Sequence, residues 1–246
     1  MSARLNLTLF AHLCARPEDE LDLVEAALLI AETEHPGLDI ARYVRAIDEL
    51  GRGARAAVER AGGPAESRLE RAVRYVYEEA GFHGNQDDYY DPRNSFLSDV
   101  IDRRTGIPIT LAVVLTEVCR RAGVEARGVS FPGHFLVRAD LPRGTIVVDP
   151  FAGRPISRDE LRALFVRATG DDGDPPPALL DPATKAQILT RILHNLRGIY
   201  EARHDDDRLR GVLERLQVLA PSDAQRARIR ALGGDAPWRS GSGALN

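Results

Sequence analysis

The chain has 246 residues, of which 43% are hydrophobic and 28% charged, and its formal net charge is −4. This length allows one large domain or two small ones, and the composition is ordinary for a soluble globular protein. The slightly negative charge excludes the overall basic field that many nucleic-acid-binding proteins carry.

The N-terminal segment and the two cysteines indicate the cellular compartment in which the protein is expected. The first twenty residues contain no long apolar run, so they predict neither a secretory signal nor a membrane span. The two cysteines, Cys14 and Cys119, fall in apolar helical patterns and are expected to be free thiols, as in a reducing compartment. We therefore expect a cytoplasmic protein.

Residues 1–82 predict helices only. Apolar residues recur at helical spacing until Pro36-Gly37, which should end one helix. Ser67 is the expected N-cap of the last helix and Gly81 its C-terminal glycine. The helices expected after Pro36-Gly37 span about 38–61 and 67–82.

The next segment predicts a loop and then a buried helix. Residues 83–95 are polar, and Asn94 or Ser95 is expected to cap a short helix from residue 96. Pro108 should open a longer helix that ends at Gly123, since proline at the first helical position costs no hydrogen bond. Both faces of that helix are apolar near its start, which indicates the central helix of the core.

β-Branched and aromatic residues then predict three strands, followed by further helices. The strands are expected at 124–131, 134–139 and 145–151, and the helices at 154–169, 186–204 and 207–221. The expected divisions are a helical region at 1–82, a core at 83–170, an acidic, proline-rich linker at 171–178, a helical pair at 179–232 and a disordered tail at 233–246 that contains Trp238.

A histidine and an aspartate are expected to meet at the end of the sheet. If residue 139 lies opposite residue 144 in a hairpin, His134 lies directly opposite Asp149. Directly opposed Cβ atoms are about 4.5–5.5 Å apart, close enough for a carboxylate to accept an imidazole N–H. The sequence leaves two interpretations open, a structural pair and a remnant of a catalytic triad.

The order of helices and strands around His134 and Asp149 resembles that of a known family. A helix that begins with GIPITLA is followed by a strand, a strand with His134 at its start, and a strand that ends in Asp149-Pro150. This order resembles the transglutaminase-like (papain-like) core, and residues 20–220 resemble the bacterial SirB-type proteins. The resemblance implies an α+β fold, in which a transglutaminase-like core with a small antiparallel sheet is flanked by N-terminal and C-terminal helices.

The C-terminal helical pair is similar to a tetratricopeptide repeat. The positions that match its spacing are Leu193, Leu196, Tyr200, Leu209, Leu213, Leu216 and Pro221. A single repeat cannot bury its own apolar face, so we expect the pair to pack onto the rest of the chain.

The resemblance also identifies a missing group. Transglutaminase-like enzymes carry a nucleophilic cysteine two residues after the glycine that corresponds to Gly106, and Pro108 stands there. Cys119 lies in the same helix but about 16 Å further along it, and is expected to be a core residue. Cys14 has no mechanistic context. Thr110 is a weak candidate nucleophile, because an unactivated hydroxyl would need His134 as its base.

We expect a groove beside His134 that is lined by five residues, namely Tyr89, Tyr90, Asn94, Pro108 and Phe131. The leading hypothesis is a non-catalytic transglutaminase-like protein that binds a peptide or protein segment. The alternative is a hydrolase or acyl-transferase that acts on an amide or ester, with Thr110 or water as nucleophile.

A third hypothesis is a regulator that contacts nucleic acid. It would depend on the doublets Arg103-Arg104 and Arg120-Arg121 and on Arg226, Arg228 and Arg230. We interpret these as solvated helix faces, and nucleic acid is not the expected partner. No metal or cofactor is expected, because metal-binding and nucleotide-binding motifs are absent from the sequence. The sequence does not indicate an oligomeric state.

Overall fold

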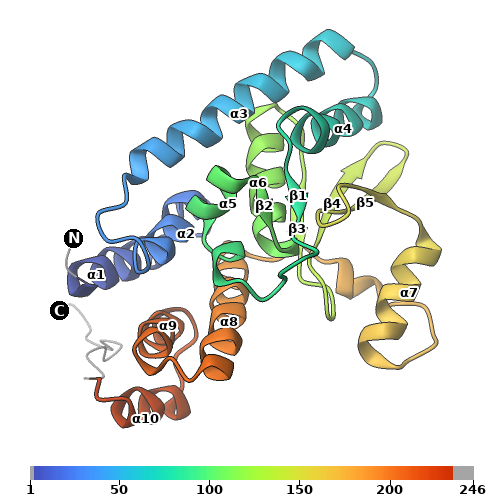
Figure 1. The fold of residues 1–246 in the computed structure, drawn as a ribbon. Coiled ribbons are helices and arrows are strands. Elements are labelled where there is room, and N and C mark those ends of the chain that lie inside the picture. The colour runs from blue at the N-terminus through green and yellow to red at the C-terminus, as the bar shows by residue number, and fades with distance from the viewer. Residues whose placement is uncertain (1–2, 235–246) are drawn as a thin grey trace, which may run out of the picture.

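The computed structural model describes residues 3–234, and Figure 1 shows its arrangement. Its N-terminal part is helical, as predicted, with α1 (Ala3–Cys14), α2 (Leu23–Ala31), α3 (Ile40–Ala61) and α4 (Ala65–Arg74). The predicted cap at Ser67 is wrong, because α4 begins at Ala65 and its N-cap is Pro64. A π-helical turn, η1 (Tyr75–Glu79), follows α4, and Gly81 leaves it with a φ of +76°.

The segment predicted as a plain loop contains two short elements. Strand β1 (His83–Gly84) pairs in parallel with β2 (Thr105–Gly106), and η2 (Pro92–Asn94) is a 3-10 turn. Helix α5 (Leu97–Arg103) has Phe96 as its N-cap. The predicted cap at Asn94 or Ser95 is therefore wrong, because both residues belong to the end of the 3-10 turn.

Helix α6 (Pro108–Arg121) is the centre of the core, as predicted. Pro108 is its first residue, and every residue from Pro108 to Cys119 is buried. The helix packs against α3, α4, α8 and strand β4, so apolar neighbours surround it on several sides. Apolar residues on both faces of its first turns fit this position, because a helix that is apolar all round must be covered all round.

The sheet is antiparallel, in the order β3 (Arg127–Val129), β4 (Leu136–Leu141), β5 (Gly144–Asp149) and β6 (Arg154–Ile156). The predicted hairpin register is wrong by two residues. Leu141 pairs with Gly144, so the connection is the two-residue turn Pro142-Arg143. A shift of two residues leaves every side chain on its predicted face, because side chains alternate along a strand with a period of two.

The residues after the hairpin form an edge strand and then a helix. The stretch predicted to return to helix at residue 154 first forms β6, and α7 (Arg158–Thr169) follows. Ser157 caps α7 by accepting from the backbone N–H of Glu160, whose side chain bonds back to the backbone of Ser157. A proline at residue 155 is tolerated in β6 because this strand lies at the edge of the sheet.

The C-terminal elements pack against the N-terminal helices. They are η3 (Pro177–Leu180), α8 (Lys185–Arg203), α9 (Asp206–Leu219) and α10 (Asp223–Ala231). Helix α10 lies in the region where only a helical pair was expected. Helix α9 packs on α1, and α8 on α2, as Figure 1 shows. The side chain of Arg208 binds both carboxylate oxygens of Glu34, at 2.7 and 2.8 Å, which ties α9 to the turn after α2.

Two further expectations concern the C-terminal tail, residues 233–246, and the linker, residues 171–178. Most of the tail predicted to be disordered, with Trp238, lies outside the described residues. Asp174 lies in the segment expected to be a linker, and its carboxylate pairs with Arg158 of α7 at 2.7 Å. Within residues 3–234, no helix is long and apolar enough to cross a membrane.

Candidate functional site

The predicted contact between His134 and Asp149 is present. His134 Nε2 lies 2.9 Å from Asp149 Oδ1, and the two side chains are only 16% and 14% exposed. The contact does not arise from direct opposition in the ladder. His134 lies in the turn before β4, whereas Asp149 ends β5 and pairs with Arg154 of β6. The turn brings the ring back over the end of β5.

Asp149 is held as an anion. Burial acts to raise the pKa of its carboxyl, but His134 and the backbone N–H groups of Phe151 and Ala152 outweigh burial and hold the pKa below its ordinary value. Both N–H groups donate to Oδ1, at 2.8 and 3.2 Å. Since Nε2 faces the carboxylate, Nδ1 is the ring nitrogen left for another partner. The pair thus has the histidine–carboxylate half of a triad.

The start of α6, where the sequence resemblance led us to expect a thiol in related enzymes, offers no hydroxyl to this pair. Pro108 is the first residue of α6 and is buried. Thr110 is 0% exposed, and its Oγ1 donates to the carbonyl oxygen of Asn94 at 2.7 Å and accepts from the backbone N–H of Ile107 at 3.2 Å. Thr110 therefore acts as a helix-end hydrogen bonder, and this arrangement argues against its role as a nucleophile.

Neither cysteine supplies a thiolate. Cys119 is fully buried in the core, as predicted. Cys14 is partly buried and packs against the same core cluster. Burial raises the pKa of each thiol to about 12. Both thiols are therefore protonated near neutral pH, whereas the attacking form of cysteine is the thiolate.

The five residues expected to line a groove divide into two groups. Tyr89 and Tyr90 are 43% and 72% exposed, and their ring centroids lie 5.3 Å apart. The prediction is wrong for Asn94, Pro108 and Phe131, whose side chains are buried. Residue type does not separate the two groups, because an amide and an apolar ring fill a core as readily as they line a groove.

The tyrosines project from a loop, residues 85–94, whose backbone is held by side-chain hydrogen bonds. We call it the tyrosine loop. Asn94 Nδ2 donates to the carbonyl oxygens of Asp88 and Tyr89, at 2.7 and 3.2 Å. Asn94 Oδ1 accepts from Asn85 Nδ2 at 3.0 Å and from Arg103 Nη1 at 3.3 Å. The buried amide thus replaces water for four polar groups and fixes the backbone that carries the tyrosines.

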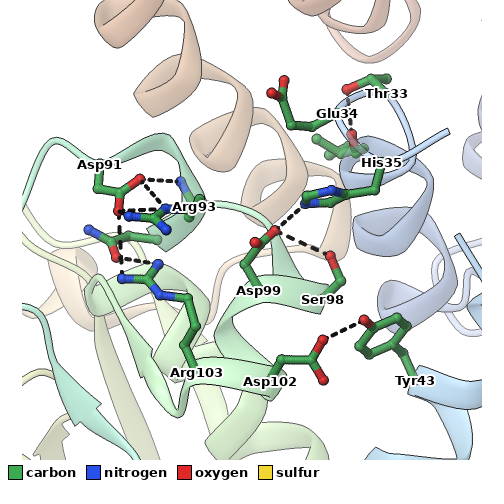
Figure 2. A network of polar contacts seen from close by, with 12 residues as sticks. Thr33, Glu34, His35, Tyr43, Asp91, Arg93, Ser98, Asp99, Asp102 and Arg103 are labelled. Carbon is green, nitrogen blue, oxygen red and sulfur yellow. Dashed lines mark hydrogen bonds and ion pairs between the residues drawn. The ribbon is translucent and has the colours of Figure 1, made fainter.

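An ion pair supports the same loop, as Figure 2 shows. Asp91 is 5% exposed and pairs with Arg93 at 2.7 Å and with Arg103 at 3.6 Å. Burial acts to raise the pKa of Asp91, but the hydrogen bonds from Arg93 and the charges of both arginines lower it below its ordinary value. A charged Asp91 therefore fixes the end of the tyrosine loop.

The tyrosine loop lies next to the histidine–aspartate pair. The ring of Tyr89 is 6.0 Å, centroid to centroid, from the ring of Phe151, whose backbone N–H binds Asp149. A hollow of about 600 Å³ is lined by Asn85, Gln86 and Asp87 of the loop and also by Phe151 and Ala152. The loop and the segment after Asp149 thus form one continuous surface.

A second histidine–aspartate contact was missed from the sequence. His35 Nε2 lies 2.6 Å from Asp99 Oδ2, which joins the turn after α2 to α5 (Figure 2). Nearby, Asp102 accepts from Tyr43 Oη at 2.6 Å and from Arg42 at 2.9 Å, which joins α3 to α5. The partners are about sixty residues apart, and no local pattern links them. These contacts fix α5, which leads through β2 into the start of α6.

No metal centre is seen within the described residues. No three His, Cys, Asp or Glu side chains between residues 3 and 234 are grouped so that they could hold an ion.

Comparison with known proteins identifies the family. A family model described as the transglutaminase-like superfamily matches residues 41–194, from the start of α3 to the middle of α8. The chain belongs to the transglutaminase-like superfamily. The matched range contains α6, the sheet, the tyrosine loop and the His134–Asp149 pair of this transglutaminase-like protein.

Sequence relatives show to which group within the superfamily the chain belongs. It is 40% identical over 237 residues to a UPF0162 protein of Xylella fastidiosa, which covers 94% of this chain and 84% of the relative. A UPF0162 protein of Pseudomonas aeruginosa is 35% identical over 180 residues, 73% of this chain and 65% of the relative. The chain is thus a member of the UPF0162 proteins. A shorter match of 74 residues, 40% identical, is to human F-box only protein 21 and covers 30% of this chain and 12% of that one.

Proposed function

We propose that this protein is a non-catalytic transglutaminase-like module that binds a peptide or a segment of another protein. The observation that carries the proposal is the exposed tyrosine pair, which a buried asparagine holds in place beside the His134–Asp149 pair. The two free thiols fit a reducing, cytoplasmic compartment.

The chemistry of the site supports binding over catalysis. Pro108 has no group that can attack, both thiols have a pKa of about 12, and the hydroxyl of Thr110 is used within the core. Catalysis through Thr110 would require it to leave its hydrogen bonds with Asn94 and Ile107. A water molecule activated by His134 is the other form of the enzymatic alternative, and hydrolysis that depends on His134 would reveal it.

The surface supports a peptide as the ligand. Tyrosines offer a large contact area at low cost in conformational entropy, and a rigid loop avoids the cost of ordering on binding. The hollow of about 600 Å³ beside the loop is within the size range of ligand sites. A peptide that lies in the hollow would contact Phe151 and Ala152, which follow Asp149, and would have to extend over the loop to contact Tyr89 and Tyr90.

We propose further that α8 and α9 are a tetratricopeptide-like pair that offers a second contact surface. Their apolar residues at the matching positions are buried, and the pair packs against the N-terminal helices. This leaves the outer faces of the two helices for a partner.

Peptides selected from a display library on the whole protein test the binding surface. The affinity for a selected peptide is expected to fall about tenfold or more in Tyr89→Ala and in Tyr90→Ala, since exposed aromatic anchors dominate such interfaces. Leu9→Ala is the matched control, because Leu9 of α1 is 41% exposed, close to the 43% of Tyr89. Equal affinity of the wild type and the Tyr89→Ala, Tyr90→Ala double variant would refute this surface.

A further inference from the structure

The tyrosine loop lies against helix α8, as Figure 1 shows. At the C-terminal end of α8, Arg203 Nη2 donates to the carbonyl oxygen of Tyr90 at 3.2 Å. Arg191, which lies earlier in α8, is close enough to Tyr89 for its charge to act on the phenol. Burial raises the pKa of Tyr89, and the positive charge of Arg191 opposes that rise. The loop therefore meets α8 at two places, and the tyrosine pair and α8 form one continuous surface.

The α8 side of this surface carries positive charge. Arg191 is partly exposed, and its guanidinium makes no hydrogen bond or ion pair with residues 3–234. Arg203 is exposed, and within the same range its side chain bonds only to the carbonyl oxygen of Tyr90. Arg197, between them, is instead paired with Glu201 at 2.8 Å. Two arginines beside the tyrosines thus lack a carboxylate partner in the described part of the chain.

The acidic residues near this surface are engaged elsewhere. Asp205, just after α8, binds the side chain and the backbone N–H of Arg208, at 2.8 and 3.1 Å, and the charge of Arg203 acts on it more weakly. In the tyrosine loop, Asp88 lies near Arg93, on which its charge acts. The aspartate that precedes Asp88 lines the hollow of about 600 Å³ described above. None of these carboxylates forms a salt bridge with the two arginines of α8 that flank the tyrosines.

The outer face of α8 is open between the two arginines. Gly198 has no side chain, and a Cβ added there would meet nothing within 4 Å. Gly198 follows Arg191 by about two helical turns and therefore lies on the same face of α8. The stretch from Arg191 to Arg203 spans about 18 Å of helix, which is the length of about five or six residues of an extended chain. A short extended segment can therefore reach both arginines as well as the exposed tyrosines.

We propose that the bound segment is an acidic peptide, an inference that rests on the peptide-binding function proposed above. The segment lies extended over the tyrosine loop and α8. Its aspartate or glutamate side chains bind Arg191 and Arg203, and its apolar side chains pack on Tyr89 and Tyr90. A basic segment would meet two cations that have no carboxylate partner, whereas an acidic one supplies it. Complementary charge of this kind selects the partner and fixes its register.

Peptides selected on the full chain whose affinity falls in Tyr89→Ala are the probes. Each is compared with an analogue in which asparagine replaces every aspartate and glutamine every glutamate. The peptides are expected to contain acidic residues, and the analogues to bind at least about fivefold more weakly, because each exposed charge pair contributes a small factor. Arg191→Gln should weaken binding of the parent peptide about threefold and leave the affinity for its analogue unchanged. Arg55→Gln is the matched control, because Arg55 is exposed on α3.

A pair of substitutions on the open face of α8 changes charge at constant size. Gly198→Glu places a carboxylate on the proposed path of the peptide, and Gly198→Gln places a neutral side chain of the same shape there. Both variants should fold, since the space around an added Cβ is open, and unchanged circular dichroism checks this. The acidic peptide is expected to bind Gly198→Glu at least about threefold more weakly than Gly198→Gln.

The outcomes separate this inference from the function on which it rests. Peptides that depend on Tyr89 but contain no acidic residue, amide analogues that bind as tightly as their parents, or equal affinities of the two Gly198 variants would overturn the acidic ligand and leave peptide binding intact. If no selected peptide depends on Tyr89 or Tyr90, the binding surface itself is wrong and the inference fails with it.

Discussion

Replacing Asn94 with alanine is expected to lower the free energy of unfolding by about 2–4 kcal/mol. Asn94 is 0% exposed, and its amide serves the carbonyl oxygens of Asp88 and Tyr89 and the side chains of Asn85 and Arg103. Alanine would leave all four groups without this partner, including the side chain of Asn85, which is buried. Because the same bonds fix the tyrosine loop, the variant should also lose affinity for any peptide that binds Tyr89 and Tyr90.

Urea unfolding followed by circular dichroism measures the first effect. Gln86→Ala is the control, because Gln86 lies in the same loop but is exposed, and its free energy of unfolding should change by less than about 0.5 kcal/mol. Equal stability of Asn94→Ala and Gln86→Ala would show that the amide network does not hold the loop.

Leu115→Ala is expected to cost about 2–5 kcal/mol, the range measured when a buried leucine is truncated. Leu115 is 0% exposed near the middle of α6, which has α3, α4, α8 and β4 around it, so little can move in to fill the space. Leu115→Met, which conserves volume, should cost less than about 1.5 kcal/mol. The midpoints of urea unfolding measure both changes. A truncation that costs no more than Leu9→Ala on the exposed face of α1 would contradict the central place of α6.

Local signals made α6 predictable. A proline that opens a helix and apolar residues on both of its faces lie within one short stretch, and the structure confirms both the start at Pro108 and the burial. The contact between His134 and Asp149 was predicted from a wrong register. It was still correct because the turn before β4, and not the pairing of the two strands, places the histidine at the end of β5.

Other features had no local signal. Ile229 is the only large apolar residue among the nine of α10, so no strong hydrophobic period marks this helix. The pairing of His35 with Asp99 joins residues 64 positions apart. For Asn94, Pro108 and Phe131 the sequence indicated chemistry near the site but not the direction of each side chain, and burial decided that. Residue type alone does not separate an asparagine that lines a groove from one that ties a loop together.

We propose that the His134–Asp149 pair supports binding without catalysis. The most direct measurement is the rate at which the full chain hydrolyses p-nitroanilide and p-nitrophenyl ester substrates, compared with His134→Ala, together with intact mass after exposure to an acylating probe. The wild type and the variant are both expected to match the uncatalysed rate, and Thr110 is expected to carry no acyl group. Hydrolysis that disappears in His134→Ala, or an acyl group on Thr110, would contradict it and show that the site is an active one.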